Sequence, residues 1–301
     1  MRLDCARPAA PGRFYESYEE VTQVQDRGLA AYIAELVGTL LLVFFITSVV
    51  ALYIATGANA QFGSDFAVVG LTHFLVLFAL IISIGVASGG HFNPAITTAF
   101  IVLRRIDPID GLVYILAQLS GGVLGALLTK AFLLDEGRAS DYGTPKISAL
   151  LGSGFQGFLV EGIGTFVLVM TVLAVALNPE TRRWAALSVG GALGFLVMVL
   201  GPLTGGSFNP ARWFGPALVS NEFADPLAYI LGPVAGALVA AALYKFVIEP
   251  ASGPVQEAAD TVAPRGPAPP AGEAPPLRQE RGPGGPGGPP PASPPGGIAG
   301  S

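Results

Sequence analysis

The sequence is poor in charge and nearly free of cysteine and histidine. Only 12% of its 301 residues are charged, and it contains two histidines and one cysteine, Cys5. Soluble domains carry about 25% charged residues, so the chain is too apolar for a soluble enzyme. A single cysteine excludes an intrachain disulfide.

The charged residues that remain give no sign of a catalytic or nucleic-acid-binding site. The net charge is −5 and the basic residues are few and scattered, which argues against a nucleic-acid-binding surface. The sequence contains no metal-ligand cluster, phosphate-binding loop or nucleophile–base set. We therefore expect neither an enzyme nor a cofactor or metal site.

Long apolar runs dominate what is present. The chain is 51% hydrophobic, with a mean hydropathy of +0.59. A helix of about 20 apolar residues crosses about 30 Å of hydrocarbon. Runs of this length lie near residues 31–53, 67–86, 109–132, 154–177, 184–201 and 226–247. Because backbone groups in lipid must bond one another, these runs predict an all-α membrane protein built as one bundle of six transmembrane helices.

The basic residues predict the orientation of these spans. One side of the bundle receives Arg104, Arg105, Arg182 and Arg183 in two short loops, together with Arg2, Arg7, Arg13, Arg27 and Lys245, and the other side receives Lys130, Arg138 and Lys146. Loops rich in Lys and Arg face the cytoplasm. We expect a multi-pass protein of the plasma membrane with both termini cytoplasmic.

An internal repeat divides the apolar region into two halves. Residues 34–39 read Ala-Glu-Leu-Val-Gly-Thr, and residues 160–165 read Val-Glu-Gly-Ile-Gly-Thr. Gly-Gly-His-Phe-Asn-Pro-Ala at 89–95 matches Gly-Gly-Ser-Phe-Asn-Pro-Ala at 205–211. Three spans per half force the second half to be inverted relative to the first. Inverted repeats place their functional site at their interface, near the membrane midplane.

Each Asn-Pro-Ala motif predicts the start of a short helix. Asn caps helices well, and Pro fits the first helical turn. The apolar stretches 94–102 and 210–219 are too short to cross the bilayer, so we predict two half-helices that re-enter from opposite faces. The motif residues are Asn93, Pro94 and Ala95 in one half and Asn209, Pro210 and Ala211 in the other.

Half-helices that meet at the midplane aim their positive dipole ends at one place. The side-chain amides of Asn93 and Asn209 would then donate to one water oxygen, which interrupts a continuous proton wire. A cation about 5 Å from a unit positive charge loses about 3 kcal/mol at an effective dielectric constant of about 20. The arrangement predicts a lumen that passes neutral molecules and excludes ions.

On these motifs, residues 30–247 resemble the major intrinsic protein family, the aquaporins and glycerol facilitators. The resemblance implies a pore in each protomer, a homotetramer in membrane lipid, and passive flow of water and small neutral solutes. It places an outer selectivity filter at His73, Val197, Gly206 and Arg212. This set looks like the filter of plant tonoplast intrinsic proteins and related ammonia-permeable aquaporins, which implies water flow with leakage of ammonia, hydrogen peroxide or urea.

The resemblance also assigns supporting roles to three polar residues. Glu35 and Glu161 would accept hydrogen bonds from the backbone of the re-entrant segments, and His91 would brace the first segment. Alternatively, the two glutamates carry protons in a secondary transporter, which predicts saturable, pH-driven uptake where a passive pore predicts flux linear in the gradient. His73 has an alternative role as an interhelical histidine with satisfied hydrogen bonds.

A glycerol facilitator is a second alternative. Such proteins typically follow the motif's Arg with Asp and place Lys four residues further on, where this chain has Trp213 and Ala217. The glycerol interpretation is weakened by both residues. Trp213 itself is unusual for an aquaporin, and the sequence leaves open whether it narrows the mouth of the pore or packs outward.

Small residues beside the motifs predict close helix contacts. They are Gly38, Gly164, Gly121, Gly122, Gly125 and Ala126. The chain as a whole divides into a cytoplasmic N-terminal segment (1–29), a first pore repeat (30–132), an extracellular loop (133–153), a second pore repeat (154–248) and a Pro/Gly-rich cytoplasmic tail (249–301). The tail has too little apolar surface to offset the entropy of ordering, so we expect it to be disordered.

Overall fold

The computed structural model describes residues 28–55 and 62–251. Contacts divide the chain after Gly253, and all described residues lie in the first unit. Their regular structure is helical, and no strand occurs among them. Cys5, residues 1–27 of the N-terminal segment and residues 252–301 of the predicted tail lie outside the described residues. The first three residues of that tail, Glu249–Ala251, are helical, so the expectation of disorder is wrong for them.

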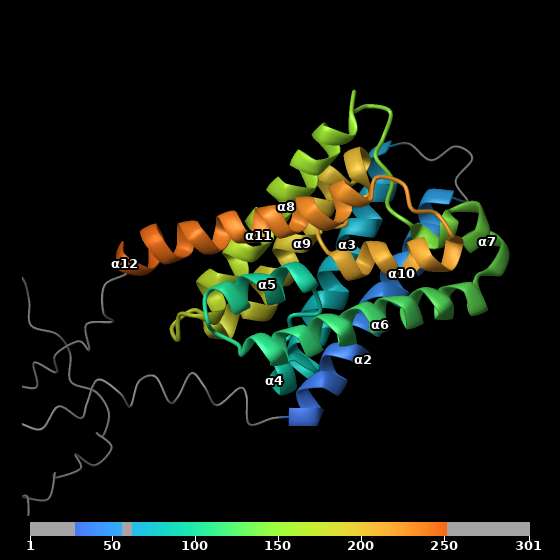
Figure 1. Ribbon diagram of the computed structural model, residues 1–301. Helices are drawn as coiled ribbons and strands as arrows, with labels where there is room; N and C mark the ends of the chain where they lie inside the picture. Colours follow the sequence, from blue (N-terminus) through green and yellow to red (C-terminus); the bar gives the residue numbers. More distant parts are fainter. Residues whose placement is uncertain (1–27, 56–61, 252–301) are drawn as a thin grey trace, which may run out of the picture. The chain divides into compact units, whose positions relative to one another are not determined.

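Within residues 28–55 and 62–251, six helices are long and apolar enough to cross a membrane. They are α2 (Gly28–Val50), α3 (Phe62–Ser83), α6 (Pro108–Phe132), α8 (Gly154–Ala176), α9 (Ala185–Thr204) and α11 (Pro226–Leu243) (Figure 1). Each coincides with a predicted run, so the predicted all-α membrane bundle is confirmed. Large apolar side chains, Val199 and Leu227 among them, are exposed on the bundle surface, as a protein surrounded by lipid requires.

Two short helices, α5 (Pro94–Val102) and α10 (Pro210–Ser220), follow the Asn-Pro-Ala motifs. Their bounds confirm the predicted half-helices. In Figure 1 they extend in opposite directions from the middle of the bundle. The remaining short elements are η2 (Ala51–Ala55), α4 (Gly85–Ser88), α7 (Leu134–Ala139), η3 (Asp141–Gly143), η4 (Arg182–Trp184), η5 (Tyr244–Ile248) and α12 (Glu249–Ala251).

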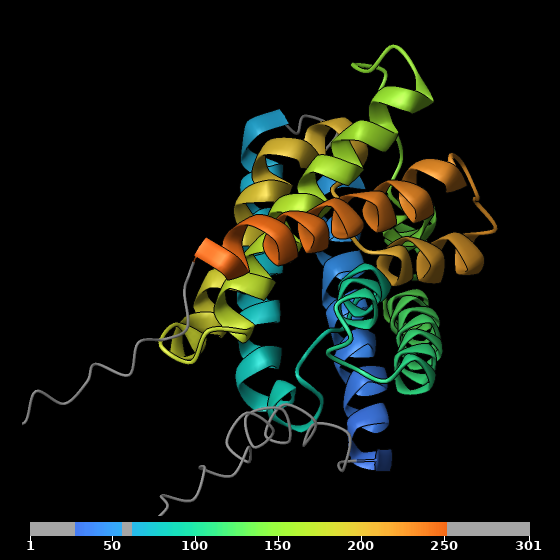
Figure 2. The same ribbon diagram turned by 60° about the vertical axis from the view of Figure 1, so that its left-hand side comes forward.

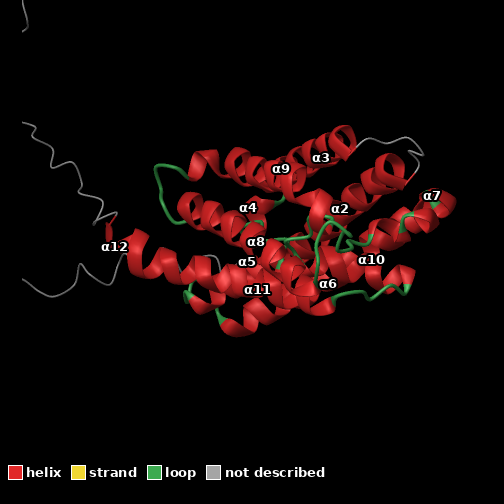
Figure 3. Ribbon diagram, turned by 90° about the horizontal axis from the view of Figure 1, so that it is seen from above, coloured by secondary structure: helices red, strands yellow, loops and turns green. Residues whose placement is uncertain are grey.

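The long helices pack in pairs that repeat between the halves. α2 packs on α6 and α8 packs on α11 (Figure 2), while α3 packs on α9 (Figure 3). Gly121 and Gly125 of α6 face carbonyl oxygens of α2, and Gly236 of α11 faces one of α8. A Cβ atom at any of the three would overlap that oxygen. The predicted role in close helix contact is therefore confirmed for Gly121 and Gly125.

Gly38 and Gly164 do not serve helix contact, contrary to the prediction. A Cβ on Gly38 would overlap the ring of Phe92, and a Cβ on Gly164 would overlap the ring of Phe208. Both rings are fully buried. The two glycines therefore make room for the aromatic residue that precedes each motif, and so anchor the re-entrant segments to the first span of each half.

Candidate functional site

Both half-helices begin as the motif predicts. The backbone of Asn93 is extended, with φ −157°, and its Oδ1 accepts from the N–H of Ala95 at 2.9 Å. Asn209 has φ −155°, and its Oδ1 accepts from Ala211 at 3.0 Å and from Arg212 at 3.3 Å. Each asparagine oxygen thus satisfies backbone donors that a helix start leaves unpaired.

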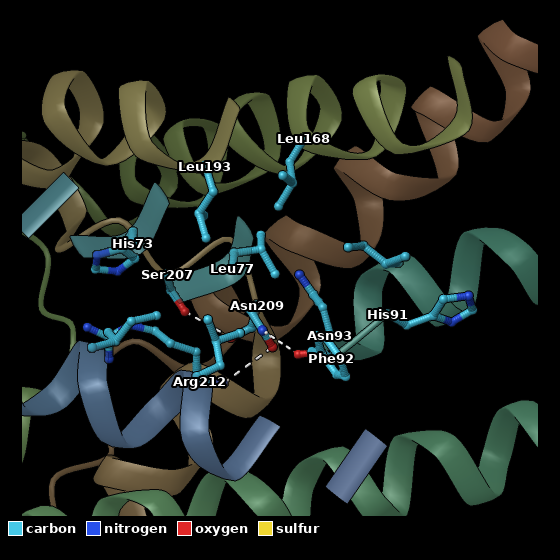
Figure 4. A pocket seen from close by; sticks show the side chains of 13 residues that line it. His73, Leu77, His91, Phe92, Asn93, Leu168, Leu193, Ser207, Asn209 and Arg212 are labelled. Carbon is cyan, nitrogen blue, oxygen red and sulfur yellow. Dashed lines mark hydrogen bonds between the residues drawn. The ribbon is translucent and has the colours of Figure 1, made fainter. Parts of the chain in front are cut away.

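The two asparagines also lock the halves together. The Nδ2 of Asn93 donates to the carbonyl of Phe208, and the Nδ2 of Asn209 donates to the carbonyl of Phe92, both at 2.9 Å. The half-helices therefore start side by side at one place. Because an amide carries two N–H groups, one donor on each asparagine is left for the lumen, which both residues line (Figure 4).

The turn before each asparagine is left-handed. Phe92 has φ 46° and Phe208 has φ 50°, and each follows a Gly-Gly pair whose φ angles are also positive. Such a backbone is costly for residues other than glycine. The rings fixed beside Gly38 and Gly164 help to hold it, and the turn aims the Asn side chain across the interface between the halves.

Glu35 accepts four hydrogen bonds, three from residues 88–92 at the first re-entrant segment and one from α6. It accepts from the N–H of His91 at 3.0 Å and of Phe92 at 2.7 Å. The hydroxyl of Ser88 donates to it at 2.6 Å, and the Nε2 of Gln118 donates at 2.7 Å. Glu35 is fully buried, and a buried carboxylate needs such donors.

Glu161 holds the second segment in the matching way. The N–H of Ser207 donates to it at 3.0 Å, the N–H of Phe208 at 2.6 Å and the hydroxyl of Thr204 at 2.7 Å. A tyrosine then ties each segment to the third span of its half. The hydroxyl of Tyr114 donates to the carbonyl of Ser88 at 2.9 Å, and that of Tyr229 donates to the carbonyl of Thr204 at 2.8 Å.

His91 sits within a polar network on the first re-entrant segment. Its Nδ1 lies 3.1 Å from the hydroxyl of Thr97, which also accepts from the Nε2 of Gln118 at 2.9 Å. The His91 ring packs against Phe100 and Tyr114 at centroid distances of 4.5 and 5.5 Å. The ring also lines the lumen, so one side chain both supports the segment and borders the path.

The lumen around the two asparagines is a narrow cavity of about 20 Å³. A space of about 10–15 Å³ is enough for one water molecule, so the passage accommodates roughly single water molecules. Its lining is mostly apolar, and apart from His73 of α3 its polar residues lie on the re-entrant segments and the start of α10 (Figure 4). The lining residues are Leu42, Ile46, His73, Leu77, His91, Phe92, Asn93, Ile96, Leu168, Leu193, Ser207, Asn209 and Arg212.

The four predicted filter positions fall into two pairs. His73 and Arg212 line the cavity. Val197 and Gly206 are not among the lining residues but adjoin each other, since a Cβ on Gly206 would lie 3.3 Å from Cγ2 of Val197. Of the four predicted filter residues, two thus line the cavity with their side chains, and the other two adjoin each other.

His73 and Arg212 each keep one nitrogen without a partner among the described residues, the Nε2 of His73 and the Nε of Arg212. The Nδ1 of His73 lies 2.7 Å from the carbonyl of Val69. Because only an N–H can bond a carbonyl, Nδ1 carries the proton and Nε2 of a neutral ring is an acceptor. The outer end of the cavity thus combines one acceptor with a guanidinium donor.

The carbonyl of Gly143 is a site group that the sequence did not reveal. It accepts from the Nη1 of Arg212 at 2.8 Å. Asp141, Tyr142 and Gly143 all have positive φ, between 50° and 72°, and this left-handed turn turns the carbonyl toward Arg212. A backbone group leaves no motif in the sequence, although a glycine in the long loop between α6 and α8 is consistent with an unusual turn.

The repeat could have located more of the lining. Leu42 and Leu168 have the same spacing as Glu35 and Glu161, and both line the cavity. Residues that match across an inverted repeat lie symmetrically about the interface. Matching the halves position by position would therefore have found this pair, whereas the six-run pattern alone could not.

The family and its relatives agree with this geometry. Residues 21–244 match the family described as Major intrinsic protein. The chain is 38% identical over 213 residues to glycerol uptake facilitator protein-like 6 of Lactiplantibacillus plantarum, a match that covers 70% of this chain and 94% of the relative. It is 34% identical over 241 residues to probable aquaporin TIP2-2 of Oryza sativa subsp. japonica, with coverages of 78% and 92%. It is 35% identical over 236 residues to probable aquaporin AqpM of Archaeoglobus fulgidus, with coverages of 72% and 96%.

A solved structure shares the fold. The X-ray structure of the aquaglyceroporin from Plasmodium falciparum matches with a TM-score of 0.64 at 21% identity, covering 74% of this chain and 98% of the other. At that identity the likeness concerns the fold alone. It agrees with the bundle of six spans and two half-helices.

Proposed function

The chain belongs to the major intrinsic protein family, and on that premise we propose that it is a passive water channel of the plasma membrane that excludes protons and ions. Members of this family are membrane channels and not enzymes. The observation that carries the proposal is the meeting of two helix starts, with the amides of Asn93 and Asn209, at a cavity with room for about one water molecule.

At this point a water molecule would accept hydrogen bonds from the protein in place of those from neighbouring water molecules. Its oxygen accepts from the free amide N–H groups of Asn93 and Asn209 while its own hydrogens point away along the pore. Both helix starts contribute positive potential there, and Arg212 adds a full charge further out. A cation must lose hydration and meet this potential, whereas neutral water loses little, so the same groups favour water and exclude ions.

The proposed solute range includes ammonia, hydrogen peroxide and urea. His73, Val197, Gly206 and Arg212 form the proposed filter, and two observations support it: His73 and Arg212 border the cavity, and Val197 adjoins Gly206. Valine offers no hydrogen-bond donor where water-selective relatives typically carry histidine. The outer constriction is therefore wider and less polar than water alone requires.

We propose a homotetramer with both termini in the cytoplasm. The orientation rests on the basic residues, since Arg104, Arg105, Arg182 and Arg183 fall in two loops of one side. The tetramer rests on the family. Neither feature is needed for the lumen described above, which is built within one chain.

The name of the Lactiplantibacillus plantarum relative favours glycerol as a second candidate solute. In this chain Trp213 and Ala217 occupy the positions at which glycerol facilitators typically carry Asp and Lys. A glycerol-uptake assay run beside the water assay separates the two. If glycerol flux exceeds that of empty vesicles by as large a factor as water flux does, the glycerol proposal would replace the water-channel proposal.

Reconstitution of the full chain into proteoliposomes tests the proposal. Under osmotic shock, stopped-flow light scattering should show shrinkage much faster than in empty vesicles, linear in the osmotic gradient and independent of a pH gradient. Uptake that saturates and needs a pH gradient would instead support a transporter in which Glu35 and Glu161 carry protons.

A further inference from the structure

Trp213 lies behind the outer constriction and does not line it. It follows Arg212 directly, yet its side chain is only 1% exposed and is absent from the lining of the lumen. It is the largest fully buried side chain in the described part of the chain. Of the two roles that the sequence left open, packing is the one observed.

Four segments meet around Trp213 at the outer end of the second half. Its ring stacks on Tyr229 of α11, with centroids 5.8 Å apart and 10° between the planes. Phe223, in the loop between α10 and α11, meets it edge-on at 6.0 Å. Ile147 of the extracellular loop and Phe158 of α8 pack against the same buried cluster. A large flat ring at such a junction fixes the spacing of the segments around it.

One chain of contacts leads from Trp213 to the segment that carries Gly206. The hydroxyl of Tyr229 donates to the carbonyl of Thr204. Thr204 donates to Glu161, which holds the backbone N–H groups that follow Gly206. The position of the Tyr229 ring therefore bears on the backbone at the third filter position.

A second chain of contacts leads through the extracellular loop to Arg212. Ile147 packs against the Trp213 cluster, and the next residue, Ser148, donates its N–H to the carbonyl of Leu203 at 2.8 Å. The same loop delivers the carbonyl of Gly143 to the guanidinium of Arg212. Both chains of contacts thus end at proposed filter residues.

Among the described residues, the first half also has rings around its matching tyrosine, since Tyr114 contacts Tyr32 and His91, but no tryptophan lies among them. Thr97 occupies the position that matches Trp213, and its hydroxyl is hydrogen-bonded to Gln118 and contacts His91. Ile96 occupies the position that matches Arg212. The buried tryptophan therefore accompanies the half that carries the guanidinium.

We propose that Trp213 is a positioning residue that sets the solute size limit of the outer constriction. It does so by fixing the separation between Arg212 and the segment of Gly206. This inference rests on the proposed function, because a constriction selects solutes only in a pore that conducts. The pair Asn93 and Asn209 has its own hydrogen bonds, so loss of the Trp213 contacts should leave water flow intact while larger solutes pass more easily.

A matched pair of variants tests the inference. Tyr229→Phe removes the hydroxyl that reaches Thr204 but keeps the ring on Trp213, and Tyr114→Phe removes the matching hydroxyl of the first half, which reaches Ser88. Trp213→Phe reduces the junction itself. Water and urea permeabilities would be measured on proteoliposomes by stopped flow, and folding checked by size-exclusion chromatography and thermal unfolding.

We expect Tyr229→Phe and Trp213→Phe to raise the urea-to-water permeability ratio by about threefold or more, the change that a barrier shift of about 0.7 kcal/mol produces. Tyr114→Phe should leave the ratio at the wild-type value. A merely structural role would lower the unfolding temperature without moving the ratio. If Trp213→Phe does not fold, the two tyrosine variants decide.

Three results would overturn the inference: an unchanged ratio in a folded Trp213→Phe, an unchanged ratio in Tyr229→Phe, or an equal change in Tyr114→Phe. Fast wild-type water flow combined with any of these results removes only the positioning role. Absence of wild-type water flow removes the proposed function as well, so the two failures are distinguishable.

Discussion

Each half of the chain holds its re-entrant segment with a glutamate at the matching position, but the residues around the two glutamates differ. In the first half Glu35 lies in a polar network that Gln118 and Thr97 extend. In the second half the matching positions are Pro233 and Trp213, and an aromatic cluster takes the place of the network. A re-entrant segment held by a glutamate can thus be surrounded by either polar or aromatic side chains.

The difference separates two tasks. What the halves share, the capping asparagines and their crossed hydrogen bonds, builds the centre of the proposed water path. What they do not share lies at one end of the cavity, where Arg212 replaces the matching Ile96 and donates to the carbonyl of Gly143. On the proposed function, water passage belongs to the symmetric part, and solute selection belongs to the asymmetric part.

Replacing each glutamate by glutamine should have the largest effect and should show the difference between the two halves. Glutamine in place of Glu161 has one acceptor oxygen where the carboxylate has two. One of the buried donors around it therefore loses its acceptor, and each unpaired buried group costs about 1–3 kcal/mol. Glu35→Gln should cost less than Glu161→Gln, because Oε1 of Gln118 has no partner among the described residues and can accept from the new amide. Thermal unfolding of the purified variants should show both midpoints lowered, that of Glu161→Gln further.

Equal losses in the two variants would contradict this account of the polar network. The variant Glu35→Gln with Gln118→Leu provides the control. It removes the compensating acceptor, so its unfolding midpoint should fall below that of Glu35→Gln alone.

Alanine at the two matching glycines should show where the halves are equivalent. Gly38→Ala and Gly164→Ala each place a methyl group on a buried phenylalanine ring, and overpacking of a core costs about 1–3 kcal/mol. Since Phe92 and Phe208 lead into the asparagines, water permeability of proteoliposomes should fall in both variants, to a similar extent. Gly191→Ala is the control, because no atom lies within 4 Å of the added carbon. A loss in only one of the pair would show that the halves are not equivalent at this contact.

The smallest effect is expected at the extracellular surface. Lys146 donates to Asp141 at 2.6 Å, and this hydrogen bond raises the pKa of Lys146. Because the pKa of Lys146 is raised by folding, the ion pair stabilises the protein fully at any pH below the usual lysine pKa. That stabilisation is lost as the pH rises through the folded-state pKa, above about pH 10. Exposed pairs contribute about 0.2–1 kcal/mol. Lys146→Met should therefore lower the unfolding midpoint only slightly, equally at neutral and weakly alkaline pH, and a large loss would contradict a surface role.

Much of the fold could be predicted because it follows from composition and symmetry. Apolar runs of membrane length predict the six spans, since lipid leaves the backbone no other partner. The two Asn-Pro-Ala motifs predict the half-helices, because capping by Asn and the fixed φ of Pro are local properties. Local rules are enough for both, and the observed bounds of α5 and α10 agree with the prediction.

The contacts that decide the site were less predictable. Gly38 was assigned to helix contact and instead faces Phe92, because the sequence shows that a small residue is needed but not which neighbour needs the space. The carbonyl of Gly143 is a backbone group and leaves no signal. Trp213 was noticed as unusual, yet its direction depends on which face of α10 meets α11, and that follows from tertiary packing alone.

Stopped-flow measurement of water shrinkage and ammonia-driven internal alkalinisation, on the wild type and on His73→Phe combined with Val197→His, tests the central claim most directly. The account predicts fast water flow in both proteins and ammonia flow that is lost in the double variant, because the shared centre is intact while the outer constriction is narrowed. No wild-type water flow above empty vesicles, or ammonia flow unchanged in the double variant, would contradict it.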